Sequence, residues 1–93
     1  MGNWKNKIIN AHNKISEHIR KTPIIKLQDF FENINVELKL EQFQHTGSFK
    51  VRGAFNYILS KNIPNKSITA ASGGNHGAAV AYASSKLKYN CNI

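Results

Sequence analysis

Residues 67–93 read SITAASGGNHGAAVAYASSKLKYNCNI, and this stretch decides the fold class. The run Ser67–Ala71 has the composition of a short strand, and the small residues of 75–88 are typical of a helix that packs closely on a sheet. Residues 89–90 mark a turn, after which Cys91–Ile93 begins another strand. Strand, helix and strand in this order predict two parallel strands joined by a helical crossover, the unit of α/β proteins.

The residues before this unit carry weaker signals. Isoleucines recur at helical spacing and predict a helix over 4–19. Residues 24–27 look extended, and 28–32 are expected to form one helical turn. Alternating apolar and polar side chains predict a strand with one buried face over 36–41.

A second long helix is expected from Ser48, which can cap it, to about residue 62. The order of elements then predicts a parallel sheet with helical crossovers, in which the strands 36–41 and 67–71 share one sheet. Two open strands leave apolar faces and edges uncovered. We therefore expect residues 1–93 to be a single incomplete domain, the N-terminal part of a larger catalytic domain.

Composition narrows the classes of protein. No apolar run approaches the roughly 20 residues that span a bilayer, and residues 1–14 lack the apolar core of a secretory signal. The one cysteine, Cys91, cannot form an internal disulfide, which favours a reducing, cytoplasmic location. The net charge of +8 is spread along the chain without interleaved aromatic residues, so we expect no nucleic-acid or membrane partner. The histidines show no metal-ligand spacing, and no metal is expected.

The run TGSFKVRGA, residues 46–54, carries the strongest chemical signal. Lys50 stands at a predicted helix start, beside a glycine turn and an aromatic ring. The positive helix end and desolvation disfavour its ammonium form, and a neutral amine attacks carbonyl carbon. Taken alone, Lys50 would more often be a solvated lysine at a helix start.

The loop Ser72–Gly77 makes the catalytic interpretation of Lys50 the favoured one. Its glycines let backbone approach a ligand, and the amides of a helix N-terminus bind anions. Asn75 could also be only a helix cap, and His76 could act only through its backbone. If both motifs follow strands of one sheet, they converge at its carboxyl edge, where ligands bind. An amine beside an anion cradle suits amino-acid chemistry on an aldehyde cofactor.

With both motifs in place, the chain resembles the N-terminal part of the fold-type II pyridoxal-phosphate enzymes, whose fold is tryptophan synthase β-like. The closest resemblance is to the serine/threonine dehydratase and serine racemase family, and it covers nearly the whole chain. Relatives that make cysteine follow the lysine with Asp-Arg and carry an Asn-Thr-Gly loop. This chain has Val51-Arg52 and Asn75-His76-Gly77 instead.

The resemblance implies a role for each motif residue. Lys50 would bind pyridoxal 5'-phosphate covalently through its amine and, once displaced by the substrate, would take the α-proton. Phe49 would lie against the pyridine ring, and Asn75 would hydrogen-bond the phenolic oxygen of the cofactor. The substrate carboxylate would be held by polar groups at one helix start, those of Ser72, Asn75 and His76.

The resemblance also implies a reaction, the deaminating β-elimination of L-threonine or L-serine to a 2-oxo acid and ammonia by an ammonia-lyase. Serine racemases carry a second serine directly after the position of Ser72, and Gly73 here favours the dehydratase. The phosphate cradle of the family lies farther along such chains, so residues 1–93 alone should bind cofactor poorly and be inactive. The alternatives are a serine racemase-type enzyme, or a non-catalytic chain that associates with a full-length homologue. A full-length enzyme would be a homo-oligomer.

Overall fold

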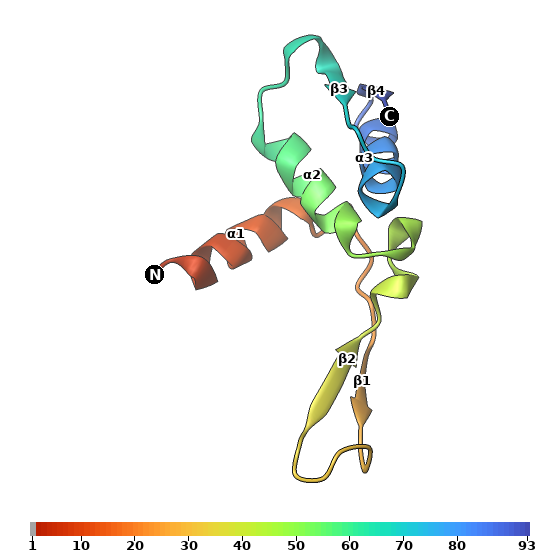
Figure 1. Ribbon diagram of the computed structural model, residues 1–93. Coiled ribbons are helices and arrows are strands. Elements are labelled where there is room, and N and C mark those ends of the chain that lie inside the picture. The colour runs from red at the N-terminus through yellow and green to blue at the C-terminus, as the bar shows by residue number, and fades with distance from the viewer. Residues whose placement is uncertain (1) are drawn as a thin grey trace.

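The computed structural model describes residues 2–93, and its elements are labelled in Figure 1. The α-helices are α1 (Trp4–Ile15), α2 (Lys50–Ser60) and α3 (Asn75–Lys86). The strands are β1 (Ile24–Leu27), β2 (Val36–Lys39), β3 (Ser67–Thr69) and β4 (Asn90–Asn92). Short 3-10 helices are η1 (Glu41–Phe43), η2 (His45–Gly47) and η3 (Pro64–Lys66).

The core lies between α2 and α3. It consists of buried apolar residues from three helices: Ile15, Val51, Ala54, Phe55, Ile58, Ala79, Val80 and Ala83. The alanines of α3 let the two helices approach closely, and the Phe55 ring, 1% exposed, fills the space between them. This ring stacks on His18 at 5.0 Å between ring centroids and meets the edge of Tyr82 at 6.1 Å. Burial of this apolar surface is the main force that holds the helices together.

The predicted strand–helix–strand unit is confirmed. β3 and β4 pair in parallel, with Ser67 opposite Asn90 and Thr69 opposite Asn92, and α3 is the crossover between them. Ile68 and Cys91, the middle pair, pack against the core. The mixed α/β class with a parallel, helix-connected sheet is therefore the one that the sequence predicts.

The predicted place of the strand 36–41 in that sheet is wrong. β2 instead pairs antiparallel with β1, from Ile24 opposite Lys39 to Leu27 opposite Val36. The resulting hairpin projects away from the helices (Figure 1). Alternating side chains indicate that a strand forms but not which strand it pairs with. The expected buried face is also wrong for residues 2–93, because Leu38 is 41% exposed.

Several predicted boundaries also need correction. α1 ends at Ile15 rather than residue 19, and α2 ends at Ser60. Residues 28–32 form no helical turn, because Asp29 takes a left-handed φ of 66°. The N-cap of α2 is Phe49, although the Ser48 hydroxyl still accepts a hydrogen bond from the Lys50 amide at 3.3 Å.

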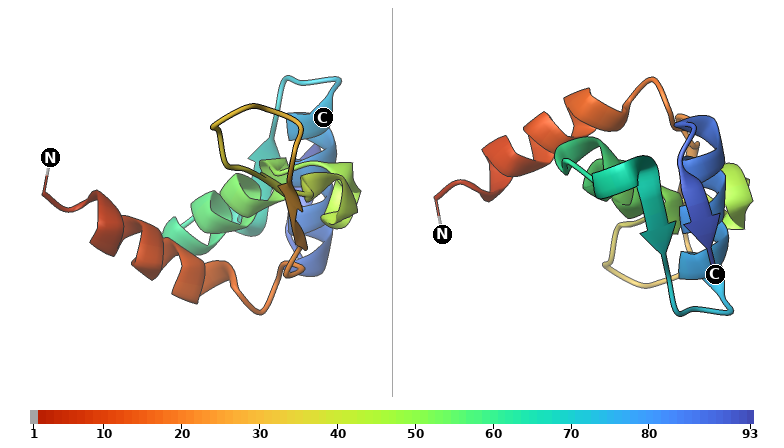
Figure 2. Two further views of the ribbon diagram at one scale, coloured as in Figure 1. Left: turned by 90° about the horizontal axis from the view of Figure 1, so that it is seen from below. Right: turned by 90° about the horizontal axis from the view of Figure 1, so that it is seen from above.

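The molecule is elongated. Its radius of gyration is 15.9 Å, whereas about 12 Å is expected for a compact chain of this length. Figure 1 shows α1 and the β1–β2 hairpin leaving the α2–α3 pair in different directions, and both views of Figure 2 show α1 extending beyond the other elements. Apolar side chains on these two projections stay exposed, among them Trp4, Ile8, Phe30 and Ile34. Among the described residues, no helix has both the length and the apolar character needed to cross a membrane.

Candidate active site

Lys50 is the first residue of α2, directly after a tight turn. Thr46 and Gly47 make this turn with left-handed φ angles of 62° and 78°. A β-branched residue rarely adopts this conformation, so the surrounding contacts must hold Thr46 in place. The next residue along, Val51, is fully buried in the core and anchors the first turn of α2.

The side chains of Lys50 and Phe49 lie together. The Lys50 Nζ is 5.3 Å from the centroid of the Phe49 ring, at which range ring and ammonium attract. Both residues are exposed, Phe49 by 59%. Residues 2–93 therefore leave the amine and one flat ring accessible to a ligand. They do not supply the desolvation of Lys50 that the sequence suggested.

Ser72 organises the loop between β3 and α3. Its Oγ accepts hydrogen bonds from the amides of Gly74 at 3.3 Å and Gly77 at 3.2 Å. Its own O–H therefore remains able to donate. The amides of Asn75 and His76, in the exposed first turn of α3, have no acceptor within residues 2–93. Three donors at one helix N-terminus form a site that suits a carboxylate or phosphate.

Gly77 is the site residue whose importance sequence reasoning missed. It is buried in the first turn of α3, and an added Cβ would lie 2.2 Å from the Ser72 carbonyl oxygen. The loop can close on the helix only because this position has no side chain. The glycine that follows Asn75-His76 in the motif was the available signal.

Within residues 2–93, the strand before Lys50 shares no sheet with β3, because it pairs with β1; the helices that carry the two motifs pack on each other instead. α2, which begins at Lys50, packs along α3, which begins at Asn75. The turn η2 before Lys50 also contacts α3, where the His45 ring stacks on Tyr82 at 4.8 Å. Burial lowers the pKa of His45, with smaller effects from the nearby positive charges of Arg20 and Lys86. Neutral His45 packs against the Tyr82 ring without burying a charge.

Arg52, in the first turn of α2, pairs with Glu41. The Arg52 Nε donates to Glu41 Oε1 at 2.5 Å and Nη2 donates to Oε2 at 3.1 Å. These bonds lower the pKa of Glu41 from 4.5 to about 2. The Arg52 guanidinium is thus already paired with a protein carboxylate.

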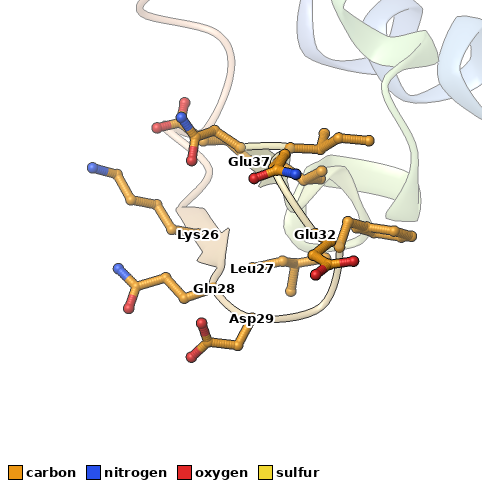
Figure 3. Close-up of a pocket in the computed structure, with 11 residues that line it drawn as sticks. Lys26, Leu27, Gln28, Asp29, Glu32 and Glu37 are labelled. Carbon is orange, nitrogen blue, oxygen red and sulfur yellow. The ribbon is translucent and has the colours of Figure 1, made fainter.

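A hollow of about 920 Å³ lies at the tip of the β1–β2 hairpin, between residues 26 and 37. Figure 3 shows Lys26, Gln28 and Asp29 pointing away from this loop, whereas Leu27 points into it. None of the predicted site residues lines the hollow. It therefore plays no part in the candidate active site.

Comparison with known proteins gives one consistent answer. The family model described as "Pyridoxal-phosphate dependent enzyme" matches residues 15–93. A catabolic L-threonine dehydratase from Staphylococcus aureus is 46% identical over 88 residues, which are 89% of this chain and 25% of the relative. A serine racemase from Dictyostelium discoideum is 40% identical over 87 residues, 89% of this chain and 27% of the relative.

The solved structures agree with the sequence relatives. The crystal structure of serine racemase from Dictyostelium discoideum superposes with a TM-score of 0.83 at 38% identity, covering 92% of this chain and 30% of that one. The chain thus spans about a quarter of the length of the curated relatives it matches. The family match covers more than half of the chain, and the fold agrees with it. The chain belongs to the family of pyridoxal-phosphate dependent enzymes.

Proposed function

We propose that this chain supplies the lysine and the carboxylate-binding loop of a pyridoxal-phosphate-dependent dehydratase. The reaction is the deaminating β-elimination of L-threonine or L-serine to a 2-oxo acid and ammonia. One observation carries the proposal: the accessible Lys50 amine starts a helix that packs along α3, whose own start offers unused amide donors. Relatives named threonine dehydratase and serine racemase support this reaction class.

The residues present fit the cofactor of the family. An aldehyde needs a reachable amine, which Lys50 provides, and a flat pyridine ring can lie against the exposed Phe49 ring. The Asn75 side chain can donate a hydrogen bond to the cofactor's phenolic oxygen. When bound, pyridoxal phosphate acts as an electron sink that stabilises negative charge at the substrate α-carbon.

Each protein group then has a task in the elimination. The Ser72 O–H and the amides of Asn75 and His76 hold the substrate carboxylate, with the positive end of α3 behind them. Binding at this end fixes the orientation of the α-carbon. The Lys50 amine, once the substrate has displaced it, would remove the α-proton as a general base. The β-hydroxyl group takes up a proton and leaves as water, and the resulting enamine is hydrolysed by one water to the 2-oxo acid and ammonia.

Gly73 favours elimination over racemisation. Racemisation needs a second acid or base on the opposite face of the cofactor, and Gly73 has no side chain to move a proton. A Cβ at this position would meet nothing within 4 Å, and the backbone conformation is one that other residues adopt. Packing therefore does not require a glycine at position 73. The runner-up function, an amino-acid racemase, would need its second proton carrier elsewhere.

The proposal also covers the substrate, the oligomeric state and the location of the enzyme. The substrate is a small amino acid, and the longer form of the enzyme is a homo-oligomer, as is common in this family. The unpaired Cys91 is consistent with a cytoplasmic location. A non-catalytic chain that associates with a longer homologue remains the alternative from a different class.

A chimera tests the proposed reaction directly. Residues of this chain replace the matching segment of the Staphylococcus dehydratase, and 2-oxo acid and ammonia are measured with L-threonine and with L-serine. We expect turnover with the wild-type segment and none with Lys50→Ala, whereas Lys61→Ala, just beyond the C-terminal end of α2, leaves turnover unchanged. Turnover by the Lys50→Ala chimera would overturn the proposal. Appearance of D-serine with little 2-oxo acid would favour the racemase.

A further inference from the structure

A carboxylate outside the proposed reaction contacts the helix turn that carries Lys50. Glu41 begins η1, and only 18% of its side chain is exposed. Besides the two bonds from Arg52, its Oε2 accepts a hydrogen bond from the Thr22 hydroxyl at 2.5 Å. Bidentate arginine–carboxylate pairs fix direction as well as distance, because both groups are planar.

The cluster around Glu41 ties three segments of the chain together. Arg52 lies two residues after Lys50, in the same turn of α2. Thr22 is 4% exposed and precedes β1, and its carbonyl oxygen accepts a hydrogen bond from the Lys39 Nζ of β2 at 3.2 Å. The start of α2 is therefore fastened both to the hairpin and to the segment before it.

A second, independent clamp holds the turn next to Glu41. Gln44 is 2% exposed. Its side-chain Nε2 donates to the Arg20 carbonyl oxygen, and its side-chain Oε1 accepts from the Arg20 backbone amide, both at 2.9 Å. The Arg20 guanidinium donates to the Phe43 carbonyl oxygen at 3.2 Å. The residues between β2 and Lys50 thus have fixed positions relative to residues 20–22. Through its bonds from Arg52, Glu41 fixes the first turn of α2 relative to the same residues.

We propose that Glu41 is a positioning residue for Lys50, acting through Arg52 to fix the first turn of α2 and so the point from which the amine extends. The inference rests on the proposed function of Lys50. It assigns Arg52 to the protein scaffold and not to a ligand phosphate. If Glu41 served stability alone, replacing Glu41 and Arg52 together by neutral residues would restore every property that the loss of Glu41 impairs.

The experiment measures where pyridoxal phosphate attaches to this chain. The chimera described above is incubated with pyridoxal phosphate, the imine is trapped by borohydride, and mass spectrometry gives the labelling of Lys50 relative to the other ten lysines of this chain's segment. Trapping detects weak binding, and the other lysines act as an internal reference. We expect a clear preference for Lys50 in the wild type. Glu41→Gln should lower the ratio on the order of tenfold or more, because small displacements of a reacting group have large effects.

Two further variants separate positioning from stability. Glu37→Gln, an exposed residue of β2, removes the same charge and should leave the ratio unchanged. The double variant Glu41→Gln/Arg52→Gln leaves no unpaired charge, so it should regain unfolding resistance in urea but not the preference for Lys50. Recovery of both properties would show that Glu41 has a structural role only and would overturn the inference.

The possible failures can be told apart. A chimera with the wild-type segment that shows no preference for Lys50 contradicts the proposed function itself. A wild-type preference that persists in folded Glu41→Gln contradicts the positioning role alone. If Glu41→Gln does not fold, Arg52→Lys replaces it, because lysine keeps the charge but loses the second nitrogen. A several-fold lower ratio in Arg52→Lys supports the inference, and an unchanged ratio overturns it.

Discussion

Gly77→Ala tests whether the closeness of the Ser72 loop to α3 matters. In an ordinary helix, replacing glycine by alanine stabilises by about 1 kcal/mol. Here the new Cβ would lie 2.2 Å from the Ser72 carbonyl oxygen and 3.1 Å from the Ile93 Cγ2 atom. The loop must therefore move by roughly an ångström to relieve this contact. Overpacking of this kind costs about 1–3 kcal/mol. The move also stretches the bond from the Gly77 amide to Ser72 Oγ, worth about 1 kcal/mol.

Gly53→Ala is the matched control, because Gly53 is helical but exposed and a Cβ there meets nothing within 4 Å. Urea unfolding followed by circular dichroism should show a higher midpoint for Gly53→Ala and a lower midpoint for Gly77→Ala than for the wild type. The net loss for Gly77→Ala should be about 1–3 kcal/mol. If both alanine variants are stabilised alike, the reasoning about the loop is refuted.

Three other predictions concern stability and motion. Hydrogen bonds from Arg52 and Thr22 lower the pKa of Glu41 from 4.5 to about 2 in the folded chain, so its contribution to stability is complete above pH 4.5 and is lost as the pH falls toward 2. Urea midpoints should fall more over this range in the wild type than in Glu41→Gln; equal slopes would argue against the ion pair. Phe55→Ala should cost about 3–5 kcal/mol, whereas Tyr57→Ala, at a residue 61% exposed, should cost under about 0.5 kcal/mol; similar losses in urea unfolding would contradict this core. Hydrogen exchange should be faster at the amides of the β1–β2 hairpin than in α2 and α3, because an isolated hairpin is marginally stable. Equal protection would contradict the view that the hairpin stands apart from the helices.

Local signals in the sequence predicted the elements near the site well. The glycine-flanked loop 72–77 and the small-residue helix after it were identified because turn residues and helix periodicity act over short distances. Lys50 was placed at a helix start for the same reason, and the structure puts it there. The roles assigned to Lys50, Phe49, Ser72, Asn75 and His76 stay predictions.

The pairing of residues 36–41 was the part of the fold that the sequence did not reveal. The pattern of residues 36–41 fits an antiparallel hairpin as well as a parallel sheet, and only its pairing with β1 decides between them. The contacts that fasten the lysine turn were equally hidden. Glu41 and Arg52 lie eleven residues apart, and Gln44 binds Arg20 across twenty-four residues. No periodicity links such pairs, so only the folded chain identifies the partners.

The central claim is that Lys50 and the loop 72–77 serve one ligand. The direct measurement is the amide spectrum of ¹⁵N-labelled chain that carries reductively trapped pyridoxal phosphate on Lys50, recorded while L-serine is added. We predict that the largest shifts occur at the Asn75 and His76 amides. Shifts confined to other segments, such as the hairpin tip, would contradict the claim that the amine and the loop share a site.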